Sequence, residues 1–199
     1  MSDATPLRNT YDKYDTPNPV ERRLMAGFFS ALDGALSDVD PERVLEVGAG
    51  EGEVTARVSE LFPTVPVLGF DLPDDETRMH WNDRGVTGTF GDIHELPFPD
   101  GSFDLVLAIE VLEHVAYPEI ALAEIERVTR SHLIASVPRE PVWRMANLAR
   151  GKYVTDLGNT PGHINHWTTR GFAGLIGRRF EVESVTHPFP WTMVRATLR

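Results

Sequence analysis

Residues 44–52 read VLEVGAGEG, a short apolar strand that runs directly into three closely spaced glycines. Glycine lets the backbone approach a ligand where any Cβ atom would clash, and it adopts the positive φ angles of tight turns. A helical pattern follows, with apolar side chains at Val54, Val58 and Leu61. A strand, a glycine turn and a helix in this order are typical of α/β sheets, which bind nucleotide-like ligands outside the carboxyl end of that strand.

Strands and helices alternate on both sides of this unit. A helix precedes it, with Asn18 as its N-cap, Pro19 at the first helical position and Glu21 placed for a capping box. Such alternation indicates a parallel sheet that is covered on both faces. The expected strands are 43–47, 65–70, 86–90, 103–109 and 132–137, and further helices are expected at 74–82, 118–128, 141–150 and 168–179.

The last two apolar segments break the alternation. Phe180–Thr186 and Thr192–Leu198 are separated by only the five residues 187–191. A connection this short has no room for a crossover helix, so we expect the two strands to lie antiparallel. The predicted fold is a single-domain, Rossmann-like α/β sandwich of three layers with a mostly parallel sheet.

Length, composition and charge narrow the possibilities. The 199 residues suit one domain, expected over 18–199 behind a flexible arm of residues 1–17. The absence of cysteine excludes disulfides and thiolate zinc sites and suggests a cytoplasmic location, and no apolar run approaches the roughly 18 residues of a membrane span. The net charge of −11 argues against nucleic acid as a partner, although 1–138 contain 10 basic and 26 acidic side chains and 139–199 contain 9 and 4.

Three carboxylates stand at or near the ends of the first three strands. Glu46 precedes the first glycine by two residues, where a carboxylate suits a cationic ligand better than a pyrophosphate. Asp71 follows the second strand and can accept both hydroxyls of a ribose, or cap a helix. Asp92 follows the third and can accept from an adenine amine, with Ile93 packed on the ring, or cap the turn before His94.

Together these motifs resemble those of the class I S-adenosylmethionine-dependent methyltransferases, and most closely the small-molecule branch of the ubiquinone and menaquinone biosynthesis enzymes. The likeness extends over about 43–198 and includes GDI at 91–93, LPF at 96–98, Asp100, SFD at 102–104 and IEVLEH at 109–114. It implies a seven-stranded sheet with the last strand reversed, and S-adenosylmethionine as cofactor with S-adenosylhomocysteine as product. By position, it implies a cofactor site made of Glu46, Gly48, Ala49, Gly50, Gly52, Asp71, Leu72, Asp92, Ile93, Glu110 and Val111.

The resemblance supplies no catalytic residue for the methyl acceptor, so candidate bases are sought among the histidines, whose pKa lies near neutral pH. His114 follows the fourth strand, and His163 and His166 lie in a loop that borders the acceptor pocket in the family's layout. Each can remove a proton or order its loop by hydrogen bonding. The two loop histidines favour a hydroxyl oxygen as acceptor. They have no obvious third ligand nearby, so no metal is expected.

Residues 138–167 are expected to form an insertion on the acceptor side. Within it, 139–153 has the pattern of a basic amphipathic helix, which can recognise a phosphate or sulfate, contact a membrane surface weakly, or pack its apolar side on the core. The basic character of this half favours a small acceptor that is anionic or linked to a lipid or sugar. Candidate substrate-binding residues are Tyr11, Tyr14, Arg144 and Trp167, and the chain is expected to be a monomer or a homodimer.

Two other functions stay open at this point. An NAD(P)-dependent oxidoreductase would use a similar glycine turn, but its fingerprint places the third glycine one residue later, and the chain has no Tyr-x-x-x-Lys pair. A non-catalytic S-adenosylmethionine-binding protein would keep the cofactor motifs without transferring a methyl group. Binding of NADH would favour the first alternative, and single-turnover methyl transfer would exclude the second.

Overall fold

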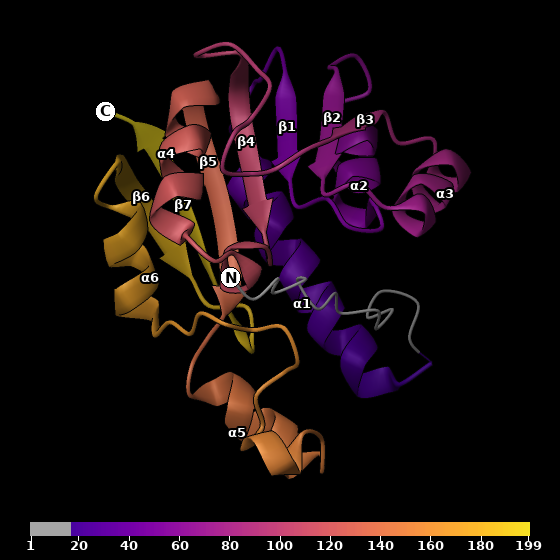
Figure 1. The fold of residues 1–199 in the computed structure, drawn as a ribbon, viewed down its shortest axis with the longest axis vertical. Helices are drawn as coiled ribbons and strands as arrows, with labels where there is room; N and C mark the ends of the chain where they lie inside the picture. The colour runs from indigo at the N-terminus through magenta and orange to yellow at the C-terminus, as the bar shows by residue number, and fades with distance from the viewer. Residues whose placement is uncertain (1–16) are drawn as a thin grey trace, which may run out of the picture.

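Seven strands form one sheet at the centre of the computed structural model, which describes residues 17–199 (Figure 1). The strand order is β3-β2-β1-β4-β5-β7-β6, and only β7 is reversed, antiparallel to both β5 and β6. This arrangement confirms the predicted fold class. The strands are β1 (Val44–Val47), β2 (Val67–Asp71), β3 (Gly88–Phe90), β4 (Phe103–Ile109), β5 (Thr129–Pro138), β6 (Phe180–Thr186) and β7 (Trp191–Leu198).

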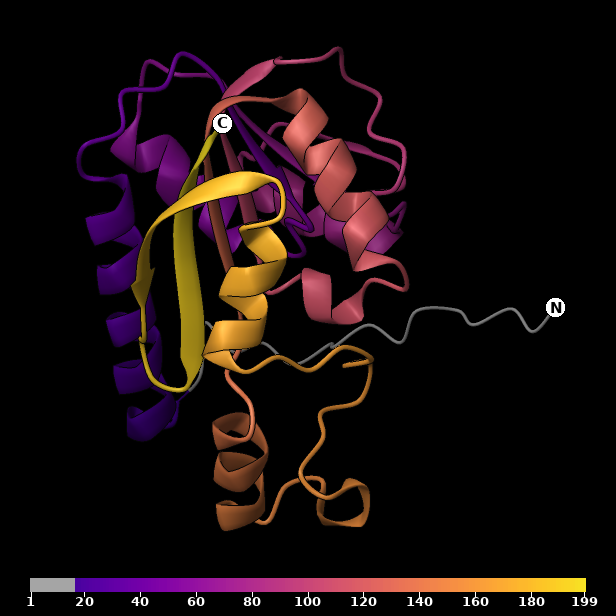
Figure 2. The same cartoon turned by 90° about the vertical axis from the view of Figure 1, so that its left-hand side faces the viewer.

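Helices cover both faces of the sheet (Figures 1 and 2). One apolar cluster joins the sheet to α1 and α2 through Leu32 and Val58, and the other joins it to α4 and α6 through Ile125 and Phe172. The sheet and the helices on its two faces make the three layers. The helices are α1 (Pro19–Leu36), α2 (Glu53–Leu61), α3 (Asp75–Arg84), η1 (Leu112–His114), α4 (Pro118–Val128), α5 (Val142–Ala149), η2 (Val154–Asp156) and α6 (Thr169–Ile176).

The central strand β4 shows why the sequence reads as a continuous apolar run there. Leu105 and Leu107 belong to the cluster under α1 and α2, whereas Val106 and Ala108 belong to the cluster under α4. Successive side chains of a strand point to opposite faces, so a strand covered on both sides is apolar at every position. Because β1, β2, β4 and β5 run parallel, their carboxyl ends meet along one edge of the sheet.

Several element boundaries differ from the predicted ones by one to three residues, and β3 and β5 show the causes. β3 begins at Gly88 rather than at residue 86, because Val86 N donates to Trp81 O and continues the turn that closes α3. β5 is longer than predicted and starts at Thr129, directly after α4. It pairs with β4 on one side and with β7 over 132–138 on the other, so tertiary pairing extends it beyond its apolar centre.

The segment between β5 and α6 extends beyond the carboxyl edge of the sheet and contains α5 and η2 (Figure 2). The side chain of Asn147 is buried and donates from Nδ2 to Gly158 O at 2.9 Å, which holds the returning loop against α5. At the base of the segment, the backbones of Arg139 and Trp167 form an isolated parallel β-bridge. Within residues 17–199, no helix combines the length and the apolar character that crossing a membrane requires.

Candidate active site

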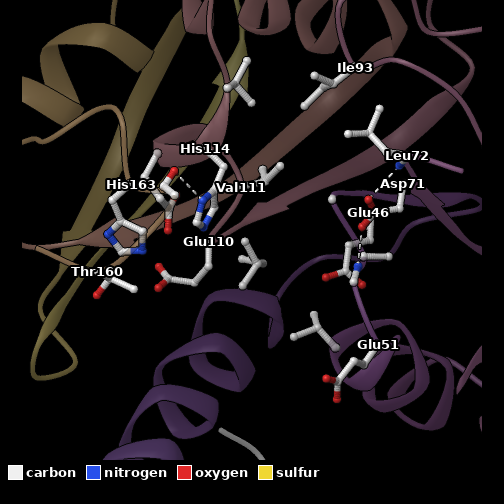
Figure 3. Close-up of a pocket in the computed structure, with 18 of the residues that line it drawn as sticks. Glu46, Glu51, Asp71, Leu72, Ile93, Glu110, Val111, His114, Thr160 and His163 are labelled. Atoms are coloured by element: carbon white, nitrogen blue, oxygen red, sulfur yellow. Dashed lines mark hydrogen bonds between the residues drawn. The ribbon is translucent and has the colours of Figure 1, made fainter. Parts of the chain in front are cut away.

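A cavity of about 700 Å³ opens at the carboxyl edge of the sheet (Figure 3). The glycine loop after β1 and the turn after β2 line one part of it, and η1 and the segment between β5 and α6 line another. Cavities of about 300–1,000 Å³ are typical of small-molecule sites. The parallel strands explain the assembly, since the residues that follow β1, β2, β3 and β4 all reach this edge.

The glycine loop adopts backbone conformations that favour glycine. The φ angle is +74° at Gly48, +51° at Gly50 and +82° at Gly52. A Cβ atom on Gly48 would lie 2.3 Å from Val111 Cγ2, so the loop packs against the turn after β4 too closely for any side chain. Gly48, Ala49 and Gly50 line the cavity, whereas Gly52 is the N-cap residue of α2 and is not part of the cavity lining.

Asp71 connects the glycine loop with the turn after β2. Its Oδ2 accepts a hydrogen bond from Gly50 N at 2.6 Å, and its Oδ1 accepts from Leu72 N at 2.7 Å. The helix-cap alternative does not apply, because Asp74 caps α3 by accepting from Thr77 N. An ionised carboxylate has about four acceptor positions, so Asp71 can also accept from ligand hydroxyls.

Glu46 is buried below the glycine loop with 2% of its surface exposed. Thr55 Oγ1 donates a hydrogen bond to its Oε2. Burial raises the pKa of Glu46 to about 8; the Thr55 hydrogen bond opposes this rise, and the negative charge of Asp71 adds to it. A cation bound beside Glu46 would favour the ionised carboxylate.

Asp92 and Ile93 line the cavity at the end of β3. Asp92 accepts from His94 N at 2.9 Å, and its Oδ1 lies 2.6 Å from His94 Nδ1. The hydrogen bond from the His94 backbone lowers the pKa of Asp92, so this exposed carboxyl is ionised at neutral pH. The contacts correspond to the predicted turn cap, and they leave the position of Asp92 beside the cavity compatible with a ligand.

Glu110 occupies the turn after β4 with a φ angle of +55°. A left-handed backbone at a residue other than glycine costs on the order of 1–3 kcal/mol and is common at functional sites. Glu110 N donates to Ser136 O at 3.0 Å, and the side chain accepts from Trp191 Nε1 at 2.6 Å and from Ser136 Oγ at 3.2 Å. These contacts fix Glu110 in the cavity wall, next to Val111.

His114 and His163 meet in the part of the cavity that η1 lines, with ring centroids 4.8 Å apart (Figure 3). His114 Nδ1 lies 2.9 Å from Gly162 O. A carbonyl oxygen only accepts, so Nδ1 carries the proton and the acceptor lone pair of the neutral ring belongs to Nε2. His163 has 6% of its surface exposed and stacks on Trp143 with a centroid separation of 5.9 Å.

His166, the other predicted base, lies outside the cavity lining. Its Nε2 is 2.7 Å from Asn159 Oδ1, and the ring is exposed. Partial burial lowers the pKa of His166, and the positive charge of Arg144 lowers it further.

The predicted substrate-binding residues are also elsewhere. Arg144 lies on α5 with its Nε 3.6 Å from Glu140 Oε1, and it does not line the cavity. Trp167 packs against Phe172 and the core, with ring centroids 5.7 Å apart. Neither side chain lines the cavity, so a role of Arg144 or Trp167 in substrate binding stays a prediction. Tyr11 and Tyr14 lie outside the described residues.

Sequence patterns did not indicate the pairing of Arg150 and Lys152 with Glu21. Arg150 Nη1 and Lys152 Nζ each lie 3.5 Å from Glu21 Oε1, and all three residues line the cavity. The start of α1 and the end of α5 thus meet at this wall, although about 130 residues separate them. The excess of basic residues after 138 was the available signal, but the sequence could not tell Arg150 from Arg144.

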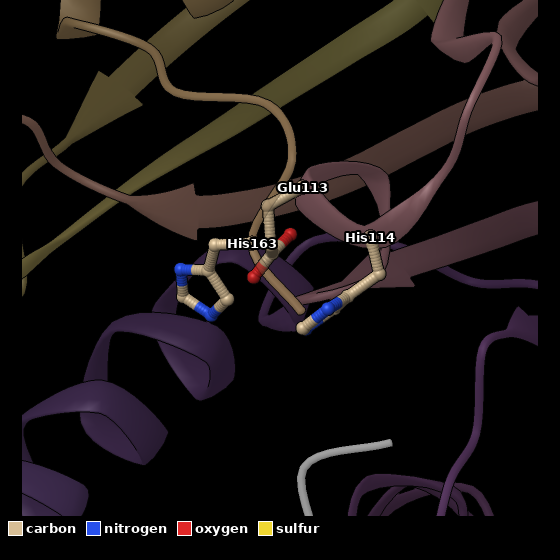
Figure 4. A group of neighbouring side chains, drawn as sticks. All are labelled: Glu113, His114 and His163. Atoms are coloured by element: carbon tan, nitrogen blue, oxygen red, sulfur yellow. The ribbon is translucent and has the colours of Figure 1, made fainter. Parts of the chain in front are cut away.

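The role of Glu113 was also missed. This residue has 1% of its surface exposed. Its carboxylate offers an oxygen that could bind a metal ion, within 4.8 Å of ring nitrogens of His114 and His163 that could do the same (Figure 4). No metal was expected because the loop histidines lacked a third ligand. In the fold, Glu113 and His114 of η1 lie beside His163, so these three side chains could together hold a metal ion.

Comparisons with known proteins agree with this arrangement. Residues 45–134, which include the glycine loop, Asp71, Asp92 and η1, match a family model described as a methyltransferase domain. The match ends before the segment that contains α5 and His163. The family model therefore covers the part of the cavity where the predicted cofactor residues gather.

Curated relatives and solved structures extend the comparison. Malonyl-[acyl-carrier protein] O-methyltransferase from Geobacter sulfurreducens is 30% identical over 136 residues, covering 64% of this chain and 50% of that protein. A ubiquinone/menaquinone biosynthesis C-methyltransferase from Ectopseudomonas mendocina is 32% identical over 127 residues, covering 59% and 50%. The chain spans about half the length of these two relatives. A structure from Pyrococcus horikoshii OT3 has the same fold, with a TM-score of 0.72, 17% identity and coverage of 96% and 97%.

Proposed function

Because the chain carries a class I S-adenosylmethionine-dependent methyltransferase domain, we propose that it transfers a methyl group from this cofactor to a hydroxyl oxygen of a small molecule. S-adenosylmethionine is the cofactor of this family, and it supplies a methyl group that is already activated on a sulfonium. One observation carries the proposal: a single cavity contains both the glycine loop with Asp71 and the pair His114 and His163.

The residues at the glycine-loop end fit this cofactor. Gly48 packs so closely on Val111 that no side chain fits there, and both residues line the cavity. In the proposed arrangement the loop holds the methionine part above Glu46, and Asp71 accepts from the ribose. A buried carboxyl is a favourable neighbour for a cation, because its ionised form is then compensated. Asp92 and Ile93 are the proposed adenine contacts, and Leu72, Glu110 and Val111 complete the site.

At the other end, the chain must align a hydroxyl with the methyl group, keep water out and take up a proton. Glu110, His114 and His163 line this part of the cavity. In this proposal the hydroxyl loses its proton in the part of the cavity beside His114 and His163, whereas His166 does not line the cavity. Alignment in the cavity converts a bimolecular reaction into an effectively unimolecular one, which is the main contribution that such a site makes.

We further propose that the acceptor is anionic or linked to a lipid or sugar. Arg150 and Lys152 are the basic side chains among the described residues that line the cavity. Their pairing with Glu21 offsets part of their charge, so they would hold an acceptor's anionic group in place of part of that pairing. The relative from Geobacter sulfurreducens is named as an O-methyltransferase of an acyl-carrier substrate, which supports oxygen as the acceptor atom.

Weak contact of residues 139–153 with a membrane surface stays a prediction. Met145 and Leu148 on α5 have 64% and 40% of their surfaces exposed, so part of the apolar side of this helix faces outward rather than onto the core. An acceptor linked to a lipid would be presented near such a surface. Sedimentation with anionic lipid vesicles, compared between the parent chain and Met145→Ser, tests this point; equal and negligible binding of both would contradict it.

A binding and transfer assay tests the function against its alternatives. We expect S-adenosylmethionine and S-adenosylhomocysteine to raise the melting temperature and NADH to leave it unchanged. Single-turnover incubation with methyl-labelled cofactor and a panel of hydroxy acids, phenols and sugar phosphates should yield a labelled product. A shift with NADH alone would favour the oxidoreductase. Cofactor binding with no transfer to any acceptor, including those in a cell extract, would favour a non-catalytic binding protein.

A further inference from the structure

We propose that Glu113, His114 and His163 bind a divalent transition-metal ion that holds the acceptor oxygen during methyl transfer. This proposal rests on the proposed function for the nature of the acceptor, but the metal site itself stands on geometry. Figure 4 shows the carboxylate of Glu113 between the two imidazole rings, which come from η1 and from the loop that precedes α6. All three residues line the cavity.

The spacing of the three donor atoms suits a metal ion. They lie within 4.8 Å of one another. Zinc–nitrogen and zinc–oxygen bonds of about 2.0–2.2 Å place ligand atoms roughly 3–3.5 Å apart in tetrahedral geometry. The three donor atoms must therefore approach one another by up to about 1–2 Å to bind an ion. Two imidazoles and one carboxylate suit Zn²⁺, Mn²⁺, Fe²⁺ or Co²⁺ better than Ca²⁺ or Mg²⁺, which prefer oxygen ligands.

The hydrogen bond from His114 to the backbone is the kind that accompanies metal ligation. Metal-binding histidines usually donate their other ring N–H to a carboxylate, a carbonyl or water, which fixes the tautomer and orients the ring. His114 Nδ1 donates to Gly162 O at 2.9 Å. The lone pair of His114 is thus on Nε2 before any ion binds. Gly162, whose carbonyl fixes this tautomer, directly precedes His163 in the chain.

Further hydrogen bonds join the two segments that carry the donors. Ile164 N and Asn165 N donate to Glu113 O at 2.9 and 3.0 Å. Asn165 Nδ2 donates to Leu112 O at 3.1 Å and to Val115 O at 2.6 Å. The loop that carries His163 is therefore fastened to η1 around the three donors. A site whose ligands are held in place before binding requires little reorganisation.

The burial of Glu113 and His163 and a free coordination position on the ion suit a site that binds the acceptor oxygen. Glu113 is 1% exposed and His163 is 6% exposed, so a carboxylate and an imidazole lie together in a region of low polarity. A dication bound among them would favour the ionised form of the carboxylate. Three protein ligands also leave at least one coordination position for an oxygen from the acceptor, as in catalytic rather than structural metal sites.

The proposed reaction forms one bond to the methyl carbon and breaks another. The ion binds the acceptor's hydroxyl oxygen and lowers its pKa, and the proton leaves to solvent. The oxygen forms a bond to the methyl carbon while the carbon–sulfur bond breaks, and its electron pair stays on sulfur as the neutral thioether of S-adenosylhomocysteine. His114 and His163 serve as ligands in this scheme, so neither needs to accept the proton.

Metal binding to the full chain tests the proposal directly. After treatment with a chelator and its removal, the chain is titrated with Zn²⁺ and Mn²⁺, and bound metal is measured by elemental analysis and calorimetry. We expect close to one ion per chain for at least one of these metals, and a loss of affinity of at least about tenfold in His163→Ala and Glu113→Gln. His166→Ala is the matched control, because this histidine lies in the same loop outside the cavity, and it should bind the ion like the parent.

The S-adenosylmethionine-induced rise in melting temperature checks folding in each variant and tests the cofactor site separately. No stoichiometric ion, or equal affinity in His163→Ala and the parent, would overturn the metal site. Full methyl transfer by chelated, metal-free protein would overturn the role of the ion in the reaction. Stoichiometric metal binding that His163→Ala abolishes, with no transfer to any hydroxyl, would uphold the site and contradict the proposed function. We expect both metal binding and metal-dependent transfer.

Discussion

The backbone N–H of Gly50 donates a hydrogen bond of 2.6 Å to Oδ2 of Asp71, so the end of β2 holds the loop that follows β1. The other oxygen of Asp71 accepts from Leu72 N, which fixes the orientation of the carboxylate. One side chain therefore shapes the cradle and presents further acceptor positions to a ligand. The proposed cofactor site depends on this pair more than on any single charged residue.

Replacing Asp71 with Ala should weaken cofactor binding strongly. The variant loses the Gly50 hydrogen bond and the proposed ribose contacts, and bonds to a charged group contribute about 1.5–3 kcal/mol. We expect the Kd for S-adenosylmethionine, measured by calorimetry, to rise roughly 10-fold to 100-fold. Asp75→Ala is the control, because Asp75 is exposed in the first turn of α3 and does not line the cavity. Equal Kd values for the two variants would contradict the assignment.

Ala substitutions at Gly48 and Gly50 should differ in effect. Both glycines have positive φ, where a side chain costs about 1–2 kcal/mol. Only at Gly48 would the new Cβ collide with Val111, at 2.3 Å, whereas the space around Gly50 is open. We expect Gly50→Ala to lower the free energy of unfolding by about that strain alone, and Gly48→Ala to lower it further and abolish the cofactor-induced melting shift. Urea denaturation checks this, and indistinguishable variants would refute it.

The stability of the cofactor-free chain should fall with rising pH because of Glu46. Its pKa is raised to about 8 from an ordinary 4.5, so the folded state binds this proton more tightly than the unfolded state. The resulting stabilisation is fully present below about pH 4.5 and is lost as pH rises through about 8, by up to about 1.4 kcal/mol per pH unit. Glu46→Gln should lack this component. Denaturation of both proteins at pH 5, 7 and 9 measures the difference, and parallel pH profiles would contradict it.

Arg150 and Arg144 provide a matched pair for the anionic acceptor. Arg150 lines the cavity beside Glu21, whereas Arg144 lies outside the cavity lining on the same helix-bearing segment. With an acceptor identified from the panel of hydroxy acids, phenols and sugar phosphates, Arg150→Ala should raise the KM for that acceptor about tenfold, which corresponds to about 1.4 kcal/mol. Arg144→Ala should leave KM unchanged. Cofactor affinity should be the same in both, and an unchanged KM in Arg150→Ala would show that the acceptor carries no anionic group there.

Local patterns in the sequence were sufficient for the fold. The apolar run of β4 and the glycine turn after β1 predict a parallel α/β sheet, and the short connection before β7 predicts its antiparallel pairing, which the observed sheet confirms. Most residues predicted to contact the cofactor line one cavity, because they stand at the carboxyl ends of parallel strands. Gly52 is the exception, since its role as the N-cap of α2 removes it from the cavity.

The acceptor end was less predictable, because its residues come together only through tertiary contacts. Whether His163 or His166 faces the cavity depends on the hydrogen bonds that fasten their loop to η1. The meeting of Glu113 with His163 likewise joins segments 50 residues apart. Composition indicated a basic half, but only the packing of α5 beside α1 selects Arg150 over Arg144.

The central claim is that the chain moves a methyl group from S-adenosylmethionine to oxygen. The most direct measurement incubates the purified chain with cofactor carrying a ¹³C-labelled methyl group and an accepting small molecule, and records the carbon NMR spectrum of the product. The account predicts one labelled resonance in the O-methyl region, together with one equivalent of S-adenosylhomocysteine. A labelled resonance in the N-methyl or C-methyl region, or no labelled product while the cofactor is bound, would contradict it.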